Sequence, residues 1–283
     1  EGLGNQFLSN IRETDAILHV LRCFDNDNIV HVDGSIDPIR DKETIDLELQ
    51  LKDLETVEKR LEKVSRAART GNKEAIKELK VLNLLQQGLA AATSVRALSI
   101  SDDDRQSYVK TMQLLTDKPV LYVCNVDESS AVDGNAYVNQ IRQVAEAEQA
   151  DVLVLAVSTE ADINELDTYE ERQLFLDDIG LTEPGAAKLI RAAYAMLNLH
   201  TYFTAGKKEV RAWTVLKGST APQAAGIIHT DFEKGFIRAE VISYVDYDSY
   251  ATEAKVKEAG KMRVEGKDYV VQDGDVMHFR FNV

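Results

Sequence analysis

The alternation of apolar and polar positions divides the chain into four regions, and residues 1–40 form the first. A short amphipathic segment at residues 6–13 precedes a nearly continuous apolar run at residues 16–24, and a polar loop follows from residue 25 to residue 40. An apolar run without regular alternation predicts a strand at the centre of a parallel sheet, covered on both faces.

Residues 41–115, the second region, have helical periodicity almost throughout. Two apolar stripes at three- and four-residue steps flank a turn at residues 70–72, and they contain Leu47, Leu51, Leu54, Val57, Leu61, Val64 and Ala68, then Ile76, Leu79, Leu82, Leu85 and Leu89. Because each stripe can bury the other, the pattern predicts an antiparallel helical coiled coil or hairpin. A third helix is predicted at residues 102–115.

The third region, residues 116–197, alternates between strand and helix patterns. Strands are predicted at residues 120–124 and 152–157, and helices at residues 135–147, 168–178 and 184–197. Such alternation is typical of a parallel sheet with helices packed on it. The first and third regions are therefore expected to form one α/β domain into which the helical hairpin is inserted.

Residues 198–283, the fourth region, are rich in strand patterns. Strands are predicted at residues 210–216, 235–245 and 276–281, with one short helix at residues 221–229 and a turn at Asp273-Gly274. A small curved sheet that grips one helix, a β-grasp, fits this order better than a sandwich does.

Charge is distributed unevenly over these regions. The chain has a formal net charge of −15, whereas the residues from Leu197 onward contain 12 Lys or Arg and 12 Asp or Glu. The first two-thirds of the chain therefore carry the whole negative charge. This balance argues against a chain that wraps nucleic acid along its whole length, but a neutral and locally basic last domain can still dock on RNA through one face.

Other bulk features bear on the cellular setting. Cys23 and Cys124 lie within apolar runs and are expected to be small buried residues. No apolar run approaches the ~18 residues of a membrane span, and no signal peptide opens the chain. These features favour a reducing, cytoplasmic setting. Because the chain opens with Glu1 in the middle of a pattern, we interpret it as an N-terminally truncated fragment.

The most informative chemistry follows the apolar run at residues 120–124, where Asn125-Val126-Asp127-Glu128 stands. A strand that delivers an Asn and, three residues later, a carboxylate is how P-loop GTPases recognise a purine base, through the motif N-K-x-D. Here Val126 replaces the Lys and Glu128 replaces the Asp. The altered motif predicts a nucleotide-binding protein whose base preference has moved away from guanine.

Glu128 supports that interpretation by its length. An Asp at this position accepts hydrogen bonds from N1–H and the exocyclic amine of guanine, and it would repel the N1 acceptor of adenine. Glu is longer by one methylene and does not reproduce the same fork, and the loss of Lys removes the aliphatic stem that covers the base. Because unpaired polar groups in a site discriminate strongly between ligands, we expect adenine preference or relaxed specificity.

A second strand end carries Ser158-Thr159-Glu160, which a shared sheet edge would place beside Asn125. In the functional interpretation Asn125 binds the imidazole edge of a purine while the Ser158-Thr159 loop packs against the base. Both segments can equally be ordinary strand-to-helix connections, in which Asn, Ser and Thr are common caps.

Further candidates lie elsewhere in the chain. His31 stands in the polar loop, where most histidines are solvated bystanders, although one near a phosphate can orient a water molecule. The last domain interleaves basic and aromatic residues, a combination that holds RNA or simply forms a solvated face over an aromatic core: Lys207, Lys208, Arg211, Lys234, Arg238 and Lys261, with Tyr202, Phe203, Trp213 and Phe236. The sequence contains no G-x-x-x-x-G-K-[ST] motif and no metal-spaced Cys/His cluster.

Several segments together resemble one family, the YchF (Obg-like) ATPases, which are translation-factor-related P-loop NTPases. Residues 2–13 (G-L-G-N-Q-F-L-S-N-I-R-E) resemble the segment after the D-x-A-G switch motif, and residues 125–128 resemble the altered base-recognition motif. Residues 198–214, 229–237 and 273–277 resemble the C-terminal TGS domain, so the likeness runs essentially from end to end.

The resemblance implies a fold and a function. The fold is α/β: a Ras-like nucleotide domain at residues 1–40 and 116–197, an inserted antiparallel coiled coil at residues 41–115, and a β-grasp TGS domain at residues 198–283. The implied function is ATP hydrolysis in preference to GTP hydrolysis, with Mg²⁺, in a cytoplasmic protein that associates with the ribosome and ribosomal RNA. No DNA or membrane partner is expected.

The resemblance also assigns residues. Asn125, Val126 and Glu128 are carried over as base contacts, and Ser158 and Thr159 as the supporting loop. His31 matches a loop histidine proposed to replace the glutamine that usually orients the attacking water.

One part of the family pattern is absent from this sequence. The N-terminal strand, the P-loop, the first switch and the D-x-A-G stretch are missing, and with them the Mg²⁺ ligands. Since phosphoryl transfer depends on that phosphate cradle and its Mg²⁺, we expect the chain as given neither to bind ATP tightly nor to hydrolyse it. Two alternatives remain: a non-catalytic RNA- or ribosome-binding adaptor, and a GTPase.

Overall fold

The computed structural model describes residues 2–206 and 209–282, so Lys207 and Lys208 lie outside the described residues. The chain divides into two compact units, Glu1–Ala193 and Tyr194–Val283, and each is described by itself. Within the described ranges, no helix has both the length and the apolar composition that a membrane crossing requires.

The first unit contains a parallel sheet, as the alternation of strands and helices predicts. Its strands are β1 (Ile17–Arg22), β2 (Val120–Asn125) and β3 (Asp151–Leu155), in the order β1-β2-β3. The central position predicted for the first strand is wrong for the sheet as described, because β1 lies at its edge. One face of β1 is buried at Leu21, whereas Leu18 and Val20 on the other face are 45% and 61% exposed.

Helices and short connections surround this sheet: α1 (Gly2–Arg12), α5 (Ala136–Glu148), α6 (Val157–Glu165), α7 (Tyr169–Asp178) and α8 (Gly185–Met196). The buried side of α5 packs against β2 and β3 through Val138 and Ile141. Cys23 and Cys124 are fully buried in the same core, as predicted. The Asn135 side chain caps α5 and also donates to the carbonyl oxygen of Cys23, so it ties the helix to the end of β1.

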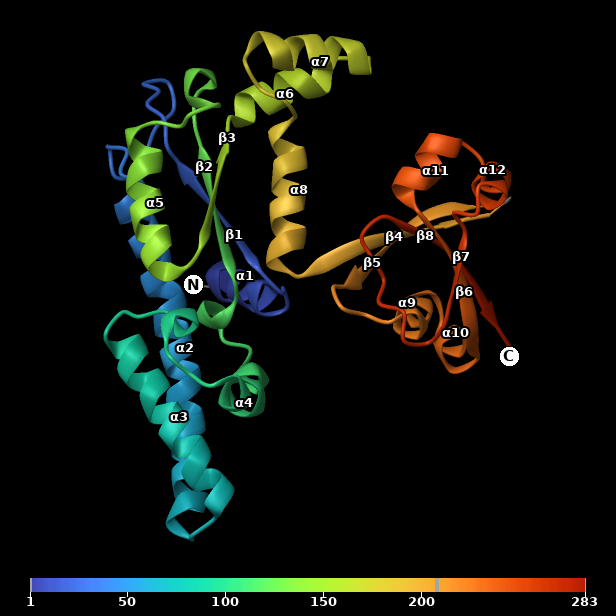
Figure 1. Cartoon of the computed structure of the whole chain (residues 1–283). Helices are drawn as coiled ribbons and strands as arrows, with labels where there is room; N and C mark the ends of the chain where they lie inside the picture. Colours follow the sequence, from blue (N-terminus) through green and yellow to red (C-terminus); the bar gives the residue numbers. More distant parts are fainter. Residues whose placement is uncertain (1, 207–208, 283) are drawn as a thin grey trace. The chain divides into compact units, whose positions relative to one another are not determined.

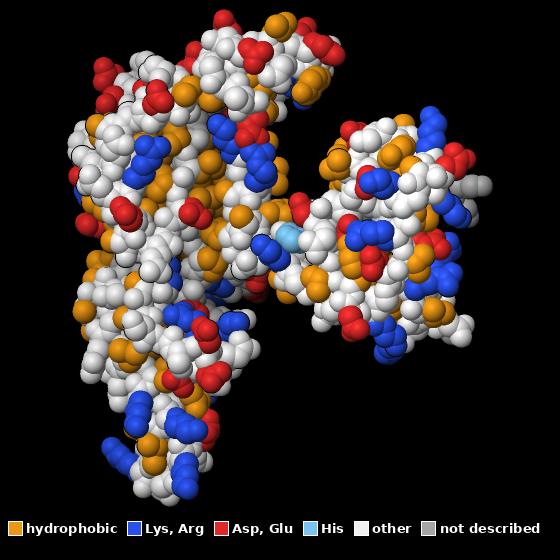
Figure 2. Space-filling view, viewed as in Figure 1, with side chains coloured by type: hydrophobic (Ala, Val, Ile, Leu, Met, Phe, Trp, Pro, Cys, Tyr) orange, Lys and Arg blue, Asp and Glu red, His pale blue; other side chains and the backbone are white. Residues whose placement is uncertain are grey.

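A long helical hairpin is inserted between β1 and β2, in agreement with the two apolar stripes (Figure 1). It consists of α2 (Pro38–Arg69) and α3 (Lys73–Ala90), and Gly71 in the turn has a φ of 83°. Asp37 caps α2, whose first residue is proline, and Asn72 caps α3. The facing stripes bury Val57, Leu82 and Leu85, while Lys and Arg side chains gather at the end that carries the turn (Figure 2).

The predicted third helix at residues 102–115 is wrong as a continuous α-helix. The segment consists of one α-helical turn, α4 (Asp102–Asp104), a π-helical turn (Arg105–Val109) and a 3₁₀ turn (Lys110–Met112). Gln113 then adopts a left-handed backbone with a φ of 49°, which ends any helix there.

Asp53 explains why the chain departs from a helix at this point. This side chain of α2 is fully buried, and its carboxylate accepts hydrogen bonds from the backbone N–H of Leu115 at 2.8 Å and of Thr116 at 2.7 Å. The Thr116 hydroxyl donates to the same carboxylate at 2.8 Å. The segment that leads into β2 is therefore held by the hairpin itself, and its N–H groups are unavailable to a helix.

Buried charges form a second connection between the hairpin and the sheet. Lys42 of α2 is 3% exposed, and its Nζ lies 2.6 Å from Asp46 Oδ2 and 2.5 Å from Glu148 Oε1 at the end of α5. Tyr122 of β2 donates to Glu148 at 2.7 Å, and Arg96 lies 3.5 Å from the same carboxylate. Burial acts to raise the pKa of Glu148, but the hydrogen bonds from Lys42 and Tyr122 outweigh it and leave the pKa below its usual range.

The second unit contains a five-stranded sheet in the order β5-β4-β8-β6-β7. Its strands are β4 (Leu199–Ala205), β5 (Val210–Leu216), β6 (Phe236–Ser243), β7 (Arg263–Glu265) and β8 (Asp275–Phe281). Strands β5, β6 and β8 were predicted from the pattern, whereas β4 and the short β7 were not. The β4 strand pairs with β5 in antiparallel and with β8 in parallel orientation.

One helix of this unit packs a buried face on the sheet, at the position that the pattern predicts. It is α9 (Ala221–Ile228), whose Ala221, Ala224 and Ala225 are fully buried, and Tyr202 of β4 donates to the carbonyl oxygen of Ala224 at 2.7 Å. The described residues of this unit also form α10 (Thr230–Lys234), α11 (Tyr244–Tyr250) and α12 (Glu253–Glu258).

Asp53→Asn is expected to lower the free energy of unfolding of the first unit by about 1–3 kcal/mol, because an amide group would face N–H and O–H donors that need an acceptor. Urea unfolding followed by far-ultraviolet circular dichroism measures this change. The exposed Glu55→Gln is the matched control, and Trp213, the single tryptophan, reports the second unit by fluorescence. Equal midpoints for the two variants would contradict the role assigned to Asp53.

Candidate functional site

The three parallel strands end in register at one edge of the sheet. Arg22 at the end of β1 pairs with Asn125 at the end of β2, and Asn125 pairs with Leu155 at the end of β3. The polar segments that follow these strands therefore begin side by side. Ligands of open parallel sheets bind beyond this carboxyl edge, so the edge is the first place to look for a site.

Asn125 connects two of these segments. Its side-chain oxygen Oδ1 accepts a hydrogen bond from the backbone N–H of Val157, the first residue of α6, at 3.1 Å. Ala156 precedes α6 and has no polar side chain, so Asn125 performs the capping that Ala156 cannot. Among the residues that the structure describes, none accepts from the Asn125 amide nitrogen, which leaves its two N–H groups available to a ligand.

The two carboxylates after Asn125 differ in their availability. Asp127 accepts from the Ser129 hydroxyl at 2.7 Å and from the Ser130 N–H at 2.9 Å, and these hydrogen bonds hold the pKa of Asp127 below its usual range. Glu128 is exposed, and its side-chain carboxylate has no hydrogen-bond partner within the described ranges. Glu128 is therefore the free carboxylate of the motif, while Asp127 shapes the turn.

Val126 is not a surface residue. Its side chain is 2% exposed and belongs to the core beneath the sheet edge, and its N–H donates to the carbonyl oxygen of Leu155 at 3.0 Å. Any ligand contact at this position would have to come from the backbone or from a moved side chain, so the base contact assigned to Val126 remains a prediction.

Ser158 and Thr159 do not form the predicted loop, because they belong to the first turn of α6. The strand ends two residues earlier than the pattern predicts, at Leu155, since Val157 is already helical. Ser158 is exposed, whereas Thr159 is 1% exposed and its hydroxyl has no hydrogen-bond partner among the described atoms. The site next to Asn125 is thus a helix N-terminus, whose free N–H groups favour acceptors and negative charge.

Glu160, the next residue, has a role that the sequence did not reveal. Its carboxylate accepts from the N–H groups of Gly185 at 2.5 Å and Ala186 at 2.9 Å, at the start of α8. A Cβ at Gly185 would meet Leu155 Cδ1 and the Glu160 carboxylate, so any larger residue here would displace these two side chains. A Glu in the first turn of one helix, followed at a distance by Pro184-Gly185, is the only signal in the sequence for this contact.

His31 lies in the loop between β1 and α2, and both of its ring nitrogens are engaged. Nδ1 accepts from the Asp33 N–H at 3.2 Å, which makes Nε2 the protonated nitrogen, and Nε2 donates to Asp41 Oδ2 at 2.9 Å. Asp41 stands in the first turn of α2. The loop histidine is therefore bound to the base of the hairpin, and its hydrogen bonds do not reach the Asn125–Glu128 segment.

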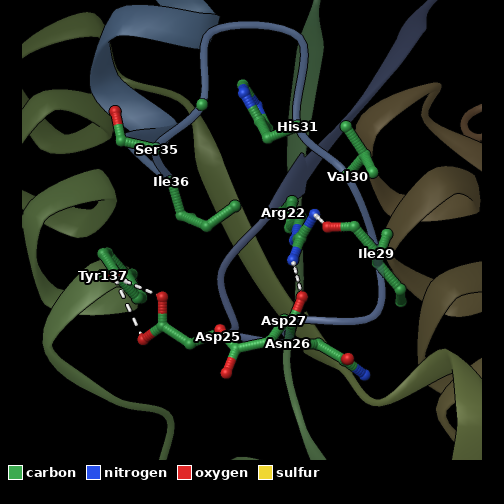
Figure 3. Close-up of a pocket in the computed structure, with 11 residues that line it drawn as sticks. Arg22, Asp25, Asn26, Asp27, Ile29, Val30, His31, Ser35, Ile36 and Tyr137 are labelled. Atoms are coloured by element: carbon green, nitrogen blue, oxygen red, sulfur yellow. Dashed lines mark hydrogen bonds between the residues drawn. The ribbon is translucent and has the colours of Figure 1, made fainter.

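A pocket of about 500 Å³ lies beneath this loop (Figure 3). Arg22 holds the loop by donating to the carbonyl oxygens of Phe24, Asn26 and Ile29, and Tyr137 of α5 donates to the Asp25 carboxylate at 3.0 Å. Since Arg22 pairs with Asn125 in the sheet, the pocket opens beside the same carboxyl edge. Its lining is mixed in polarity and contains His31.

A metal ion is not favoured next to His31. The ligand atoms of His31, Asp33 and Asp41 lie within 4.8 Å of one another. Arg40, however, lies 3.5 Å from Asp33 Oδ2 and 3.1 Å from Asp41 Oδ1, and its guanidinium already balances their charge. Mg²⁺ also prefers oxygen ligands over imidazole, so the cluster is better explained as a hydrogen-bonded anchor for the loop.

The parallel sheet and the polar groups beyond its carboxyl edge define the class, an α/β protein with the arrangement of nucleotide-binding folds. Comparison with known proteins defines the family. Residues 199–282 match a family model, YchF-GTPase_C, described as "Protein of unknown function (DUF933)". Curated relatives named "Ribosome-binding ATPase YchF" are 54% identical in Haemophilus ducreyi, 53% in Escherichia coli O157:H7 and 52% in Bacillus subtilis, with 100% of this chain and 77% of each relative covered. The chain belongs to the YchF family.

Solved structures agree with this result. The structure described as the Schizosaccharomyces pombe YchF GTPase superposes with a TM-score of 0.83 at 36% identity, over 98% of this chain and 75% of that one. A GTP binding protein from Pyrococcus horikoshii OT3 superposes with a TM-score of 0.59 at 18% identity, which shows a shared fold only.

Asp41→Ala is expected to release His31, because it removes the acceptor of the Nε2 proton. In alkaline buffer, nitrogen-detected NMR of the imidazole should show one Nε2–H tautomer in the unaltered chain and a mixture in the variant. Hydrogen exchange in residues 24–36 should rise as well. Asp33→Ala is the matched control, since it retains the backbone N–H that binds Nδ1. An unchanged tautomer in Asp41→Ala would show that Asp41 does not hold the ring.

Proposed function

We propose that the chain is the larger part of a ribosome-associated P-loop NTPase that prefers ATP to GTP. The observation that carries the proposal is the Asn125–Glu128 segment, which stands at the carboxyl edge of the parallel sheet and joins the N-terminus of α6. The names of the relatives support both the hydrolase activity and the ribosome as partner. The same names support a cytoplasmic location with ribosomal RNA within reach.

The preference for adenine is proposed from the state of the two carboxylates. Asp127 is occupied by its own turn, so only Glu128 is free to face the base edge. Glu128 is exposed and extends further than an Asp would. Its carboxylate is therefore not placed to accept the two hydrogen bonds that N1–H and the exocyclic amine of guanine donate. The unpaired Asn125 amide then binds the imidazole edge, which adenine and guanine share. Ser158 and Thr159 support the base from the first turn of α6.

Mg²⁺ and the phosphates are proposed to bind outside these 283 residues, because the sequence has no phosphate-cradling motif. His31 is proposed to orient the attacking water once it has left Asp41. In its present position both ring nitrogens are occupied, so His31 cannot act as a base there.

The four-part division is part of the proposal. Residues 1–40 and 116–197 form the nucleotide domain, residues 41–115 a coiled-coil insertion, and residues 198–283 a β-grasp TGS domain. The order β5-β4-β8-β6-β7 with α9 packed on the sheet supports the last assignment. A GTPase is the second candidate, and the description of the S. pombe relative as a GTPase favours it. Without catalysis, the chain would be a ribosome-binding adaptor.

Glu128→Asp tests base selection in a version of the chain that carries a family P-loop segment ahead of Glu1. The shorter carboxylate should shift the ratio of ATP to GTP affinity toward GTP by about tenfold, since it restores the guanine fork. Competition between labelled ATP and unlabelled GTP measures the ratio. Glu165→Asp, an exposed residue at the end of α6, is the control. A guanine preference already present in the unaltered protein would favour the GTPase.

Residues 1–283 by themselves are expected to bind Mg·ATP weakly and to show no turnover, because base contacts alone leave the phosphates unbound. Titration calorimetry and a phosphate-release assay measure both properties, with the P-loop-bearing version as the control. Micromolar affinity for Mg·ATP in residues 1–283 would contradict the expectation. A P-loop-bearing version without turnover would favour the adaptor.

A further inference from the structure

Strand β5 lies at one edge of the five-stranded sheet, where it pairs with β4 and with no other strand of the described residues (Figure 1). Proteins commonly protect such edges by short strands, by Lys or Pro residues, or by bulges. The strand at the opposite edge, β7, has three residues. In contrast, β5 has seven residues, contains neither Lys nor Pro, and pairs with β4 without a register shift. The long edge of β5 is therefore open to a further strand.

Hydrogen bonds at the two ends of β5 show which of its backbone groups face outward. The N–H of Gly206 donates to the carbonyl oxygen of Glu209 at 2.9 Å, and the N–H of Lys217 donates to that of Asn198 at 2.7 Å. Because hydrogen-bonded pairs alternate along an antiparallel ladder, the odd-numbered residues of β5 bond to β4. The other residues direct their N–H and C=O groups away from the sheet: Val210, Ala212, Thr214 and Leu216. Of these groups, only the Leu216 carbonyl oxygen has another backbone partner among the described residues, the Ser219 N–H at 3.0 Å.

The side chains of these outward-bonding residues share one face of the sheet, and that face is largely apolar. Val210 and Leu216 are 73% and 62% exposed, and Ala212 between them is exposed as well. Phe203 of β4 pairs with Ala212, and the ring of Tyr244 from α11 lies 6.1 Å from the Phe203 ring. Apolar side chains that gather at a surface in this way mark interaction sites. A partner strand with apolar residues on this face would cover Val210 and Leu216.

The other face of β5 borders a pocket. Trp213 packs at the margin of the core that α9 covers, and its Nε1 donates to the Thr204 hydroxyl at 2.9 Å, which fixes the indole ring. The ring lines a pocket of about 400 Å³, whose other walls include Ile228 of α9, Phe232 of α10 and Phe279 of β8. Residues opposite each other in a pair without hydrogen bonds have Cα atoms only about 4.5 Å apart. A large apolar side chain opposite Trp213 would therefore lie next to this pocket.

Arg211 indicates the charge of the partner. Its guanidinium is exposed and stacks on the Trp213 ring, with 4.0 Å between Cζ and the ring centroid, and it forms no ion pair among the described residues. A carboxylate on the facing strand would supply the counter-charge, since opposite charges across two strands attract. The β5 strand itself contains no Asp or Glu. A second copy of β5 would therefore bring no carboxylate from its strand to Arg211, whereas an acidic segment of another protein would.

We propose that β5 binds an extended segment of a partner protein as an added antiparallel strand. The segment has an aromatic or large apolar residue opposite Trp213, an Asp or Glu opposite Arg211, and apolar residues on the face of Val210 and Leu216. Backbone hydrogen bonds provide the affinity, and the side chains at alternate positions provide the specificity. This inference goes beyond the proposed hydrolase function and does not depend on it, because it concerns the second unit alone.

The test uses a fluorescent peptide, Val-Thr-Val-Tyr-Val-Glu-Val, between flexible Gly-Ser ends. In the antiparallel register its Tyr lies opposite Trp213 and its Glu lies opposite Arg211. Anisotropy with the full chain measures the affinity. An N-methyl group on the Val between Tyr and Glu, opposite Ala212, should weaken binding at least about tenfold, because it removes a hydrogen bond to β5 and adds bulk there. An N-methyl group on the Tyr is the matched control, since that N–H points away from β5.

Variants of the chain test the same contact from the other side. Ala212→Pro removes an outward N–H without removing one that bonds to β4, and it should weaken peptide binding at least about tenfold, whereas Ala212→Val retains the N–H and should bind normally. Arg211→Glu should weaken binding of the Glu peptide and strengthen binding of a peptide with Lys at that position. Circular dichroism and the fluorescence of Trp213 report the fold of each variant. If Ala212→Pro does not fold, the N-methyl pair and the charge exchange decide.

Three results would overturn the proposal. The first is no binding of the peptide at millimolar concentration, and the second is an equal loss of affinity with both N-methyl peptides. The third is self-association of the unaltered chain in sedimentation equilibrium that Ala212→Pro abolishes, together with no peptide binding. That result would assign the edge of β5 to a second copy of the chain.

Discussion

The buried Lys42 amine is the constraint on which the arrangement of the first unit depends. An ammonium group that is almost without solvent must be surrounded by acceptors, and here they come from α2 itself and from the end of α5, with the Tyr122 ring of β2 5.3 Å away. Burial acts to lower the pKa of Lys42, but hydrogen bonds to Asp46 and Glu148 outweigh it and raise the pKa. Lys42 therefore remains charged, and α2, α5 and β2 must stay packed around its ammonium group.

This constraint reaches the candidate site through α2 and α5. The helix that carries Lys42 also presents Asp41, one residue earlier, to the ring of His31. The helix that supplies Glu148 begins at Asn135, which donates to Cys23 beside the end of β1. The loop over the pocket is therefore fixed at both of its ends by elements that the buried charges hold. The first unit behaves as one framework with the candidate site at its carboxyl edge.

The sequence predicted the parts of this framework that depend on periodicity. The hairpin stripes, β2 and α5 were predicted because apolar spacing directly reflects which face is buried. The continuous helix predicted at residues 102–115 was wrong. The apolar spacing of this segment is helical, but the backbone N–H groups of Leu115 and Thr116 at its end donate to Asp53, which is distant in sequence. The exposed face of β1 was not predicted, because an apolar run does not show whether another strand or helix packs against each face of the strand.

The candidate site could be predicted only in outline. Asn125 was identified from its place after a strand, but its cap on α6 depends on where β3 ends, and the boundary at Leu155 is not visible in the run at residues 152–157. The contacts of Glu160 with α8 and of Asp41 with His31 join positions 25 and 10 residues apart. Such contacts follow from the packed geometry, and no local pattern reports them.

The two ends of the helical hairpin carry opposite net charges, −4 over residues 38–58 and +5 over residues 59–80, and this has a consequence for how the hairpin responds to a charged partner. At about 1.5 Å per residue, the 32-residue helix α2 is about 48 Å long, several times the screening distance of about 8 Å at physiological salt. Each end therefore responds separately to a nearby charged body. In the field of a polyanion, residues 38–58 are repelled and residues 59–80 are attracted, which produces a torque on the hairpin. Such a torque acts on the hairpin before contact, so it favours one orientation of the hairpin during approach.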